Sequence, residues 1–148
     1  MKNLDNNLPR GATLGVLWEE AKHLSRLCQT KKKHVSFIVG PDGNVMSWGI
    51  NKPEQPSEYI VPCGGTYRST HSEWDAARKC SPWNWHDDGE QVSLVNFRLN
   101  NQGHLRNSRP CPLCMEWVTK WFEDRIYWSE DHGMVRMASF IDSVGEDR

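Results

Sequence analysis

Two cysteines three residues apart are the feature that most constrains how this chain folds. They lie in the segment SRPCPLC, residues 108–114, where Cys111 and Cys114 fall on one face of the first turn of a predicted helix. Pro110 stands where such a helix favours its first residue. The N-terminal end of a helix stabilises a thiolate, which is the form of cysteine that binds metal ions. The pair therefore indicates a metal site whose other ligands the fold must bring to this helix start.

A histidine at the start of a second predicted helix is the best further ligand. His71 lies in STHSEWDAARKC, and the predicted helix runs from about residue 71 to residue 79. Two helix N-termini side by side would supply one nitrogen and two sulfur ligands to zinc and leave the fourth position open, as in catalytic zinc sites. Glu73 lies about 200° around the helix from His71. It is poorly placed as a ligand and well placed to accept a proton from bound water.

The remaining apolar segments predict one α/β domain over residues 1–148. Residues 51–68, with three prolines and two glycines, and the polar residues 100–109 are predicted as connections. Helical spacing predicts a further helix over residues 13–28, and five strands are predicted in HVSFIVG, VMSWGI, QVSLVNFRL, RIYWS and MVRMA. The order α-β-β-α-β-α-β-β favours one sheet with helices packed on its faces.

Composition and charge exclude several other classes of protein. The 148 residues, 37% hydrophobic and 25% charged, suffice for a core and are not typical of disorder. The net charge is −1, and the single basic run at residues 31–33 gives no stripe for a phosphate backbone. No segment reaches the roughly eighteen apolar residues of a membrane span. The N-terminus MKNLDNNLPRG lacks the apolar stretch of a signal peptide, which favours a reducing, cytoplasmic location for the five cysteines.

The two motifs together, in the order H-x-E then P-C-x-x-C, resemble the signature of the cytidine deaminase superfamily of zinc enzymes. The segment KKKHVSFIVGPDGNVMSWGIN also resembles the opening hairpin of that family, including its G-x-N ending at Gly49, Ile50 and Asn51. The resemblance covers about residues 13–138. It implies a three-layer α/β/α fold around a five-stranded mixed sheet. The final strand is expected to be antiparallel, because RIYWSEDHGMVRMA leaves room only for a turn.

The resemblance also implies roles for the motif residues. His71, Cys111 and Cys114 would bind one Zn2+ per chain, which makes hydroxide available near neutral pH. Glu73 would take the proton of the water, pass it to the ring nitrogen of the base and later protonate the leaving ammonia.

Four further residues are predicted to contact the substrate. By the resemblance, Asn51 would hold the sugar or base, and the backbone around Ser108 would contact the exocyclic amine. Tyr127 and Trp128, at the end of a predicted strand, would line the pocket or pack in the core.

The family features point to two kinds of substrate. An antiparallel last strand resembles enzymes that act on free nucleosides and some bacterial toxin deaminases. A histidine as first ligand resembles deoxycytidylate, tRNA and polynucleotide deaminases instead. The absence of a basic stripe favours hydrolytic deamination of a small cytosine-containing nucleoside or nucleotide, with single-stranded DNA or RNA as the alternative substrate. Assembly into a homo-oligomer stays open.

Three other interpretations compete with a catalytic site. Thr70 and Glu73 fit a capping box, which would make Glu73 a helix-start residue. Cys63 would close a purely structural zinc site if it were a fourth ligand. The sequence CPLC also has the spacing of a thiol redox motif.

Overall fold

The computed structural model describes residues 14–41, 43–60, 66–80, 92–131 and 133–136. Its helices are α1 (Leu14–Ser25), α2 (Ser72–Lys79) and α3 (Pro112–Phe122). Its strands are β1 (Lys33–Val39), β2 (Val45–Ile50), β3 (Lys52–Ile60), β4 (Thr66–Thr70), β5 (Ser93–Leu99), β6 (Leu105–Arg106), β7 (Ile126–Glu130) and β8 (Gly133–Arg136). No helix among these residues is long and apolar enough to cross a membrane.

The main sheet has the strand order β2-β1-β5-β7-β8, and the two-residue strand β6 adds to β5. Strands β5 and β7 are parallel, because α3 lies in the connection between them and carries the chain back to the same end of the sheet. The other pairs are antiparallel, and β7 and β8 meet through a turn. The predicted mixed sheet with an antiparallel last strand is therefore confirmed.

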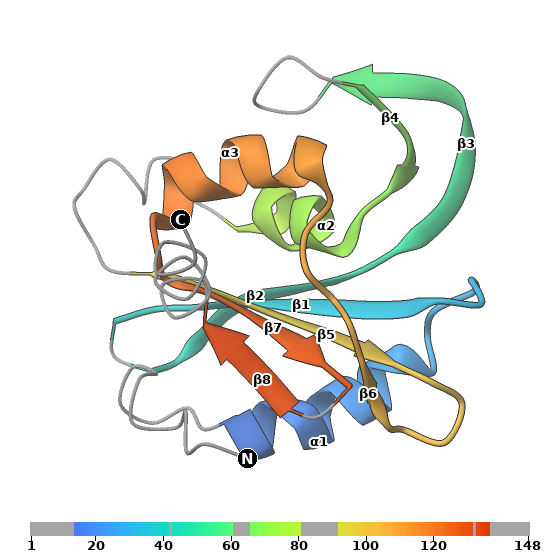
Figure 1. Cartoon of the computed structure of the whole chain (residues 1–148). Coiled ribbons are helices and arrows are strands. Elements are labelled where there is room, and N and C mark those ends of the chain that lie inside the picture. The colour runs from blue at the N-terminus through green and yellow to red at the C-terminus, as the bar shows by residue number, and fades with distance from the viewer. Residues whose placement is uncertain (1–13, 42, 61–65, 81–91, 132, 137–148) are drawn as a thin grey trace, which may run out of the picture.

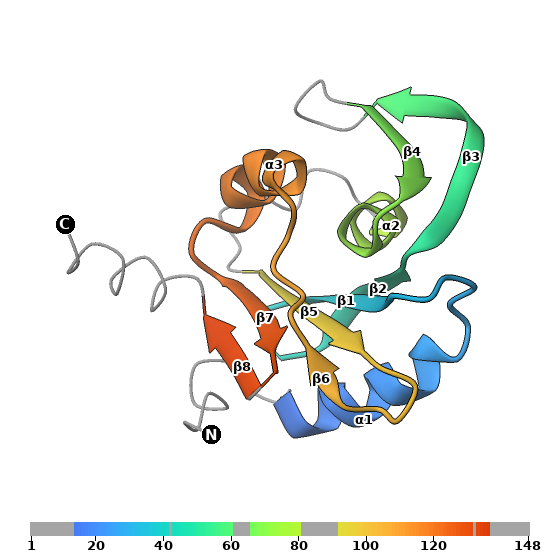
Figure 2. The same ribbon diagram turned by 45° about the vertical axis from the view of Figure 1, so that its right-hand side comes forward.

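The helices cover both faces of this sheet, as predicted. Helix α1 lies on one face, and α2 and α3 lie side by side on the other (Figure 1; Figure 2). Strand β1 has five consecutive buried residues, from Val35 to Val39, because it is central in the sheet and covered on both faces. Successive residues therefore alternate between two cores, with Phe37 in the core under α1 and Ile38 in the core under α2 and α3.

Close backbone packing holds α2 against β2. A Cβ atom at Gly49 would collide with backbone atoms of α2 at residues 72, 75 and 76. Only glycine allows the strand and the helix to approach so closely. The glycine of the G-x-N segment therefore sets the distance of the α2 start from the sheet.

A buried carboxylate strengthens the same contact. Asp75 is fully buried and accepts a hydrogen bond from the backbone nitrogen of Ile50 at 3.1 Å. Its carboxylate also pairs with three cations, Lys52, Arg78 and Lys79, at 3.3, 2.6 and 3.1 Å. Burial raises the pKa of Asp75, but the hydrogen bonds and these charges outweigh it and hold that pKa below its ordinary value.

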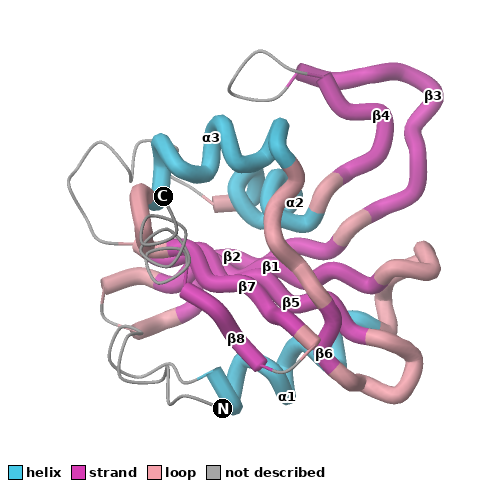
Figure 3. Tube along the Cα trace, in the orientation of Figure 1, coloured by secondary structure: helices cyan, strands magenta, loops and turns pink. Residues whose placement is uncertain are grey.

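The prediction that residues 51–68 form a loop is wrong. Strands β3 and β4 pair antiparallel in a separate two-stranded sheet that arches away from the main one (Figure 3). The prolines at positions 53 and 56 fit this sheet because both of its strands are edges, where a missing N–H is tolerated. The register shifts between Lys52 and Glu54 and again between Glu54 and Tyr59, so this pairing lacks the regular alternation that predicts a strand.

Two predicted helix starts also need correction. Helix α3 begins at Pro112 with Cys111 as its N-cap, so Pro110 lies before the helix and Pro112 takes the favoured early position. Helix α2 has His71 as its N-cap, and Thr70 ends strand β4. The capping box between Thr70 and Glu73 is therefore wrong, because Thr70 lies one residue too early to cap the helix.

Candidate metal centre

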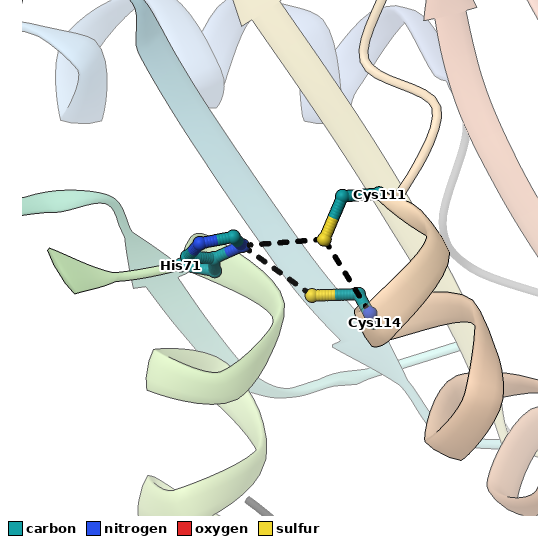
Figure 4. Close-up of side chains that lie close together, drawn as sticks. All are labelled: His71, Cys111 and Cys114. Carbon is teal, nitrogen blue, oxygen red and sulfur yellow. Dashed lines mark hydrogen bonds between the residues drawn. The ribbon is translucent and has the colours of Figure 1, made fainter. Parts of the chain in front are cut away.

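The N-termini of α2 and α3 bring the three predicted metal ligands together. The Nδ1 atom of His71 lies 3.7 Å from the Sγ atom of Cys111 and 3.5 Å from that of Cys114 (Figure 4). All three ligand atoms lie within 4.8 Å of one another. The extended backbone of His71 places its ring outside the helix, and this side chain makes no capping hydrogen bond. Residues forty positions apart thus form one cluster.

The spacing of these atoms fits a zinc ion. Zinc binds histidine nitrogen at about 2.0–2.1 Å and thiolate sulfur at about 2.3 Å, so tetrahedral geometry separates the two ligand atoms by about 3.6 Å. The two nitrogen-to-sulfur distances here, 3.5 and 3.7 Å, bracket that value. One histidine and two cysteines are also a donor set that suits zinc. The cluster therefore has the ligand types of a zinc site with three protein ligands, and its two nitrogen-to-sulfur distances match a tetrahedral zinc.

The electrostatics of the cluster favour a bound cation. Hydrogen bonding to Cys114 is the main reason that the pKa of the Cys111 thiol falls to about 3, with burial opposing it and His71 assisting. Cys111 also accepts a hydrogen bond from the backbone nitrogen of Cys114 at 3.4 Å, which caps α3. Burial lowers the pKa of His71, but the hydrogen bond to Cys111 and the charge of Glu73 raise it above its ordinary value. A Cys111 thiolate thus supplies negative charge where a metal would bind.

Glu73 lies beside this cluster without belonging to it. Among the described residues the cluster comprises His71, Cys111 and Cys114, so the Glu73 carboxylate is not a fourth ligand. Only 6% of Glu73 is exposed, and its Oε1 atom accepts a hydrogen bond from the hydroxyl of Ser72 at 2.9 Å. A carboxylate held next to a metal site can accept and return protons there.

A cavity of about 370 Å³ opens at the metal cluster. Its volume falls in the range of about 300–1,000 Å³ that is typical of small-molecule sites. His71, Glu73 and Cys111 line it, together with Asn51 and Ser108, two of the four predicted substrate contacts. A molecule in this cavity would therefore lie next to two of the three proposed metal ligands, the Glu73 carboxylate, Asn51 and Ser108.

Most of the hydrogen-bonding capacity of the Asn51 side chain is used by neighbouring residues of the cavity wall. Its Nδ2 atom donates to the Oγ1 atom of Thr30 and to the carbonyl oxygen of Lys32, both at 2.7 Å, and its Oδ1 atom accepts from the nitrogen of His34 at 3.0 Å. Both hydrogens of the amide are thus used. Any contact with a substrate would use the remaining lone pair of Oδ1.

Ser108 presents its backbone rather than its side chain. Its hydroxyl donates to the carbonyl oxygen of Asn96 at 2.9 Å and accepts from the nitrogen of Ser129 at 2.7 Å. The carbonyl oxygen of Ser108 accepts one hydrogen bond, from Asn96 at 3.3 Å, and keeps a second lone pair. Contact through the backbone around Ser108 is what the family resemblance implied.

The other two predicted contacts are not at the cavity. Tyr127 and Trp128 are fully buried and do not line it. Tyr127 packs in the core under α1, and Trp128 packs in the core under α2 and α3, with its ring nitrogen donating to Glu130 at 2.9 Å. Of the two uses that the sequence left open for this pair, the structure gives core packing. Cys63 lies outside the described residues.

Three buried polar residues that connect to Glu73 through successive polar contacts were not predicted from the sequence. Ser72, next to Glu73 in α2, was treated only as part of the motif. Ser36 and Asn96 were treated as ordinary positions of two apolar strands, yet each is almost wholly buried and hydrogen bonded to the other. The signal that could have found them is a polar residue alone at the centre of an apolar run.

The chain resembles known proteins in its three-dimensional structure but not in its sequence. No family model and no curated protein matches the sequence. Among solved structures, a cytidine deaminase from Mycobacterium leprae aligns with a TM-score of 0.55 at 12% identity, covering 86% of this chain and 95% of that chain. A cytidine deaminase from Mycobacterium tuberculosis aligns with a TM-score of 0.53 at 12% identity, covering 85% and 91%. At this identity the likeness shows the fold alone, so the chain has a cytidine deaminase-like fold.

Proposed function

We propose that this protein is a zinc-dependent deaminase that hydrolyses the amino group of a cytosine-containing nucleoside or nucleotide. The observation that carries the proposal is the cluster of His71, Cys111 and Cys114, whose nitrogen-to-sulfur distances suit zinc, beside a cavity lined by His71, Cys111 and the buried carboxylate of Glu73. The fold of the chain, which is that of cytidine deaminases, supports it. A purely structural zinc site would have no need of a buried carboxylate beside it.

The residues of the chain divide the chemistry among them. His71, Cys111 and Cys114 would hold the zinc, which when bound lowers the pKa of a coordinated water towards neutrality. Glu73 would accept the proton of that water and deliver it to the ring nitrogen of the base. It would then take the proton of the hydroxyl group added to the base and give it to the departing amine, as the ring carbonyl forms. The backbone carbonyl of Ser108 would accept a hydrogen bond from the same amine. The cavity walls around Asn51 would exclude bulk water and orient the sugar.

The charge of the cavity supports a substrate with a phosphate group. Lys32, Lys52 and Arg109 line the cavity, although the overall charge of the chain is −1. Lys52 also pairs with Asp75 at 3.3 Å, and the guanidinium of Arg109 lies over the ring of Trp128 at 5.7 Å, so both of these cations are positioned by neighbours while all three give the cavity wall positive charge. A nucleotide would use these charges, and so would a single-stranded polynucleotide, which is the second candidate substrate. Because thiolate ligands must stay reduced, we propose a reducing location such as the cytoplasm.

A substrate panel tests the proposal. Zinc-loaded protein is incubated with cytidine, deoxycytidine, their monophosphates, adenosine, guanine and single-stranded oligonucleotides, and ammonia release is measured. The expected result is release from one or more cytosine compounds, fastest for a mononucleotide. Fastest release from oligonucleotides would select the polynucleotide alternative, and no release from any compound by protein of confirmed zinc content would reject the enzyme.

A further inference from the structure

A continuous line of buried polar groups runs from Glu73 across the sheet to Ser108. The Ser72 hydroxyl lies 2.9 Å from Oε1 of Glu73, and the hydroxyls of Ser72 and Ser36 are 2.7 Å apart. Ser36 lies 2.7 Å from Oδ1 of Asn96, whose Nδ2 donates to the carbonyl oxygen of Ser108 at 3.3 Å. The line thus starts at the proposed proton carrier and ends at the proposed contact for the amine.

The line is buried along its whole length. Burying polar groups lowers the stability of a fold relative to apolar packing, so their presence calls for another explanation. Ser36 is 0% exposed, Ser72 1% and Asn96 2%. Ser36 and Asn96 are direct cross-strand partners at the centre of β1 and β5, in the register whose next pair on that face is Ile38 with Leu94. An apolar pair would continue the core there without any polar group to satisfy. The polar pair therefore points to a role other than packing.

The number of hydroxyl hydrogens in the line determines which of these groups donates to which. Each serine hydroxyl has one hydrogen, and the Oδ1 atom of Asn96 can only accept, so Ser36 donates to Asn96. The single hydrogen of Ser72 then serves either Glu73 or Ser36. The Oγ atom of Ser72 donates to Oε1 of Glu73 at 2.9 Å, so one oxygen of the carboxyl group is held by a buried hydroxyl. The Ser36 hydroxyl lies 2.7 Å from that of Ser72 and limits where the Ser72 hydroxyl can lie.

We propose that Ser72, Ser36 and Asn96 are positioning residues that fix the Glu73 carboxyl and the Ser108 backbone relative to each other. The inference rests on the proposed deaminase function. Glu73 belongs to α2, and Ser108 to the segment before α3, with two strands of the sheet between them. A line of polar contacts on those strands connects the two groups, which would act on one substrate. Ser36 and Asn96 do not line the cavity, so neither needs to touch that substrate, whereas Ser72 lines it next to Glu73.

Alanine substitution with a matched control tests the line by kinetics. In zinc-loaded protein, Ser72→Ala is expected to lower kcat about 10- to 100-fold with KM nearly unchanged, as for outer residues that orient an active group. Ser36→Ala should lower kcat less, and Ser36→Thr, which keeps the hydroxyl, should restore it. Ser47→Ala is the control, since Ser47 is also buried and donates to α2, to the carbonyl oxygen of Ala76 at 2.7 Å, outside the line.

Unchanged kcat in both alanine variants, or an equal fall in Ser47→Ala, overturns the inference. Crystal structures of zinc-loaded wild type and Ser72→Ala give a second result that does not need activity. The expected result is a displaced Glu73 carboxyl beside unmoved His71, Cys111 and Cys114, whereas a superposable carboxyl overturns the inference. If wild type deaminates nothing, the proposed function fails and the structural comparison still decides the inference. Ser36→Ala provides the same comparison if Ser72→Ala does not fold.

Discussion

The two faces of the sheet are built from different kinds of residue. The core under α1 consists of apolar side chains with Cys28, and it includes Phe37 and Phe97 packed edge to face at 5.9 Å. The face under α2 and α3 has apolar side chains too, but buried polar groups lie among them, including Ser36, Asn96 and Glu73. The first face supplies stability mainly by burial of apolar surface. The second face buries polar groups at fixed positions, and it therefore gains less stability from apolar burial.

This difference means that stability and chemistry should respond to different substitutions. Changes on the α1 face should alter the free energy of unfolding and leave metal binding and turnover alone. Changes in the groups of the opposite face that form the metal cluster or line the cavity should mainly alter metal binding and turnover, whereas Asp75, a buried carboxylate of that face outside the cavity, should act on stability. Four substitutions probe this separation, from the largest expected effect to the smallest.

Cys114→Ser should produce the largest effect. Loss of a ligand from a three-ligand site should reduce bound zinc from about one per chain to near none and abolish deamination. Metal analysis of the purified protein and ammonia release measure both. Cys80→Ser is the matched control, because Cys80 is buried in the same core outside the metal cluster and should keep its zinc. Wild-type zinc content in Cys114→Ser would contradict the ligand assignment.

Glu73→Gln should affect turnover without affecting the metal. Glutamine keeps the size of the side chain but cannot carry a proton, so kcat should fall by about 10²–10⁴-fold. Bound zinc should stay at the wild-type level in the same preparation. Glu116→Gln, an exposed change on α3, serves as the control and should leave kcat unchanged. A Glu73→Gln protein that turns over at the wild-type rate would remove Glu73 from the mechanism.

Phe97→Ala should lower stability without changing zinc binding or turnover. Removing a fully buried ring from the core under α1 should lower the free energy of unfolding by about 3–5 kcal/mol, as measured by denaturant titration. The protein that stays folded should bind zinc and turn over as wild type does. Activity is measured without denaturant, where the zinc-loaded variant is folded. A fall in kcat under these conditions would show that the two faces are coupled.

Asp75→Asn should have the smallest effect, and one that depends on pH. The folded-state pKa of Asp75 lies below its ordinary value, so its charge stabilises the fold at pH values above that ordinary value. This contribution is lost as the pH falls through the folded-state pKa. At neutral pH we expect Asp75→Asn to cost about 2 kcal/mol of unfolding free energy. Titrations of both proteins should converge in acid, and a constant difference at all pH values would contradict this role.

The sequence was sufficient to predict the cluster of His71, Cys111 and Cys114 and the layered fold. Cys111 and Cys114 were recognisable because their spacing and helix start carry a chemical meaning that does not depend on distant residues. His71 was recognisable because its helix start supplied the complementary ligand type. The antiparallel end of the sheet followed from the length of one turn between β7 and β8.

What the sequence could not supply depends on contacts between distant segments. The pairing of β3 with β4 was hidden by Pro53 and Pro56, which mark loops unless both strands are edges. The burial of Tyr127 and Trp128 depends on which faces of β7 the helices cover. Ser36 and Asn96 reveal their partnership only when β1 and β5 are in register, sixty residues apart. In each case the missing information was a neighbour in space.

Deamination in water enriched in oxygen-18 tests the central claim most directly. The zinc-loaded protein is incubated with cytosine nucleosides and nucleotides, and the products are analysed by mass spectrometry beside ammonia measurement. A hydrolytic deaminase should form the uracil product with one oxygen taken from water and release one ammonia per product, and Glu73→Gln should form almost none. Absence of a labelled uracil product from every cytosine compound, with zinc bound at His71, Cys111 and Cys114, would contradict it.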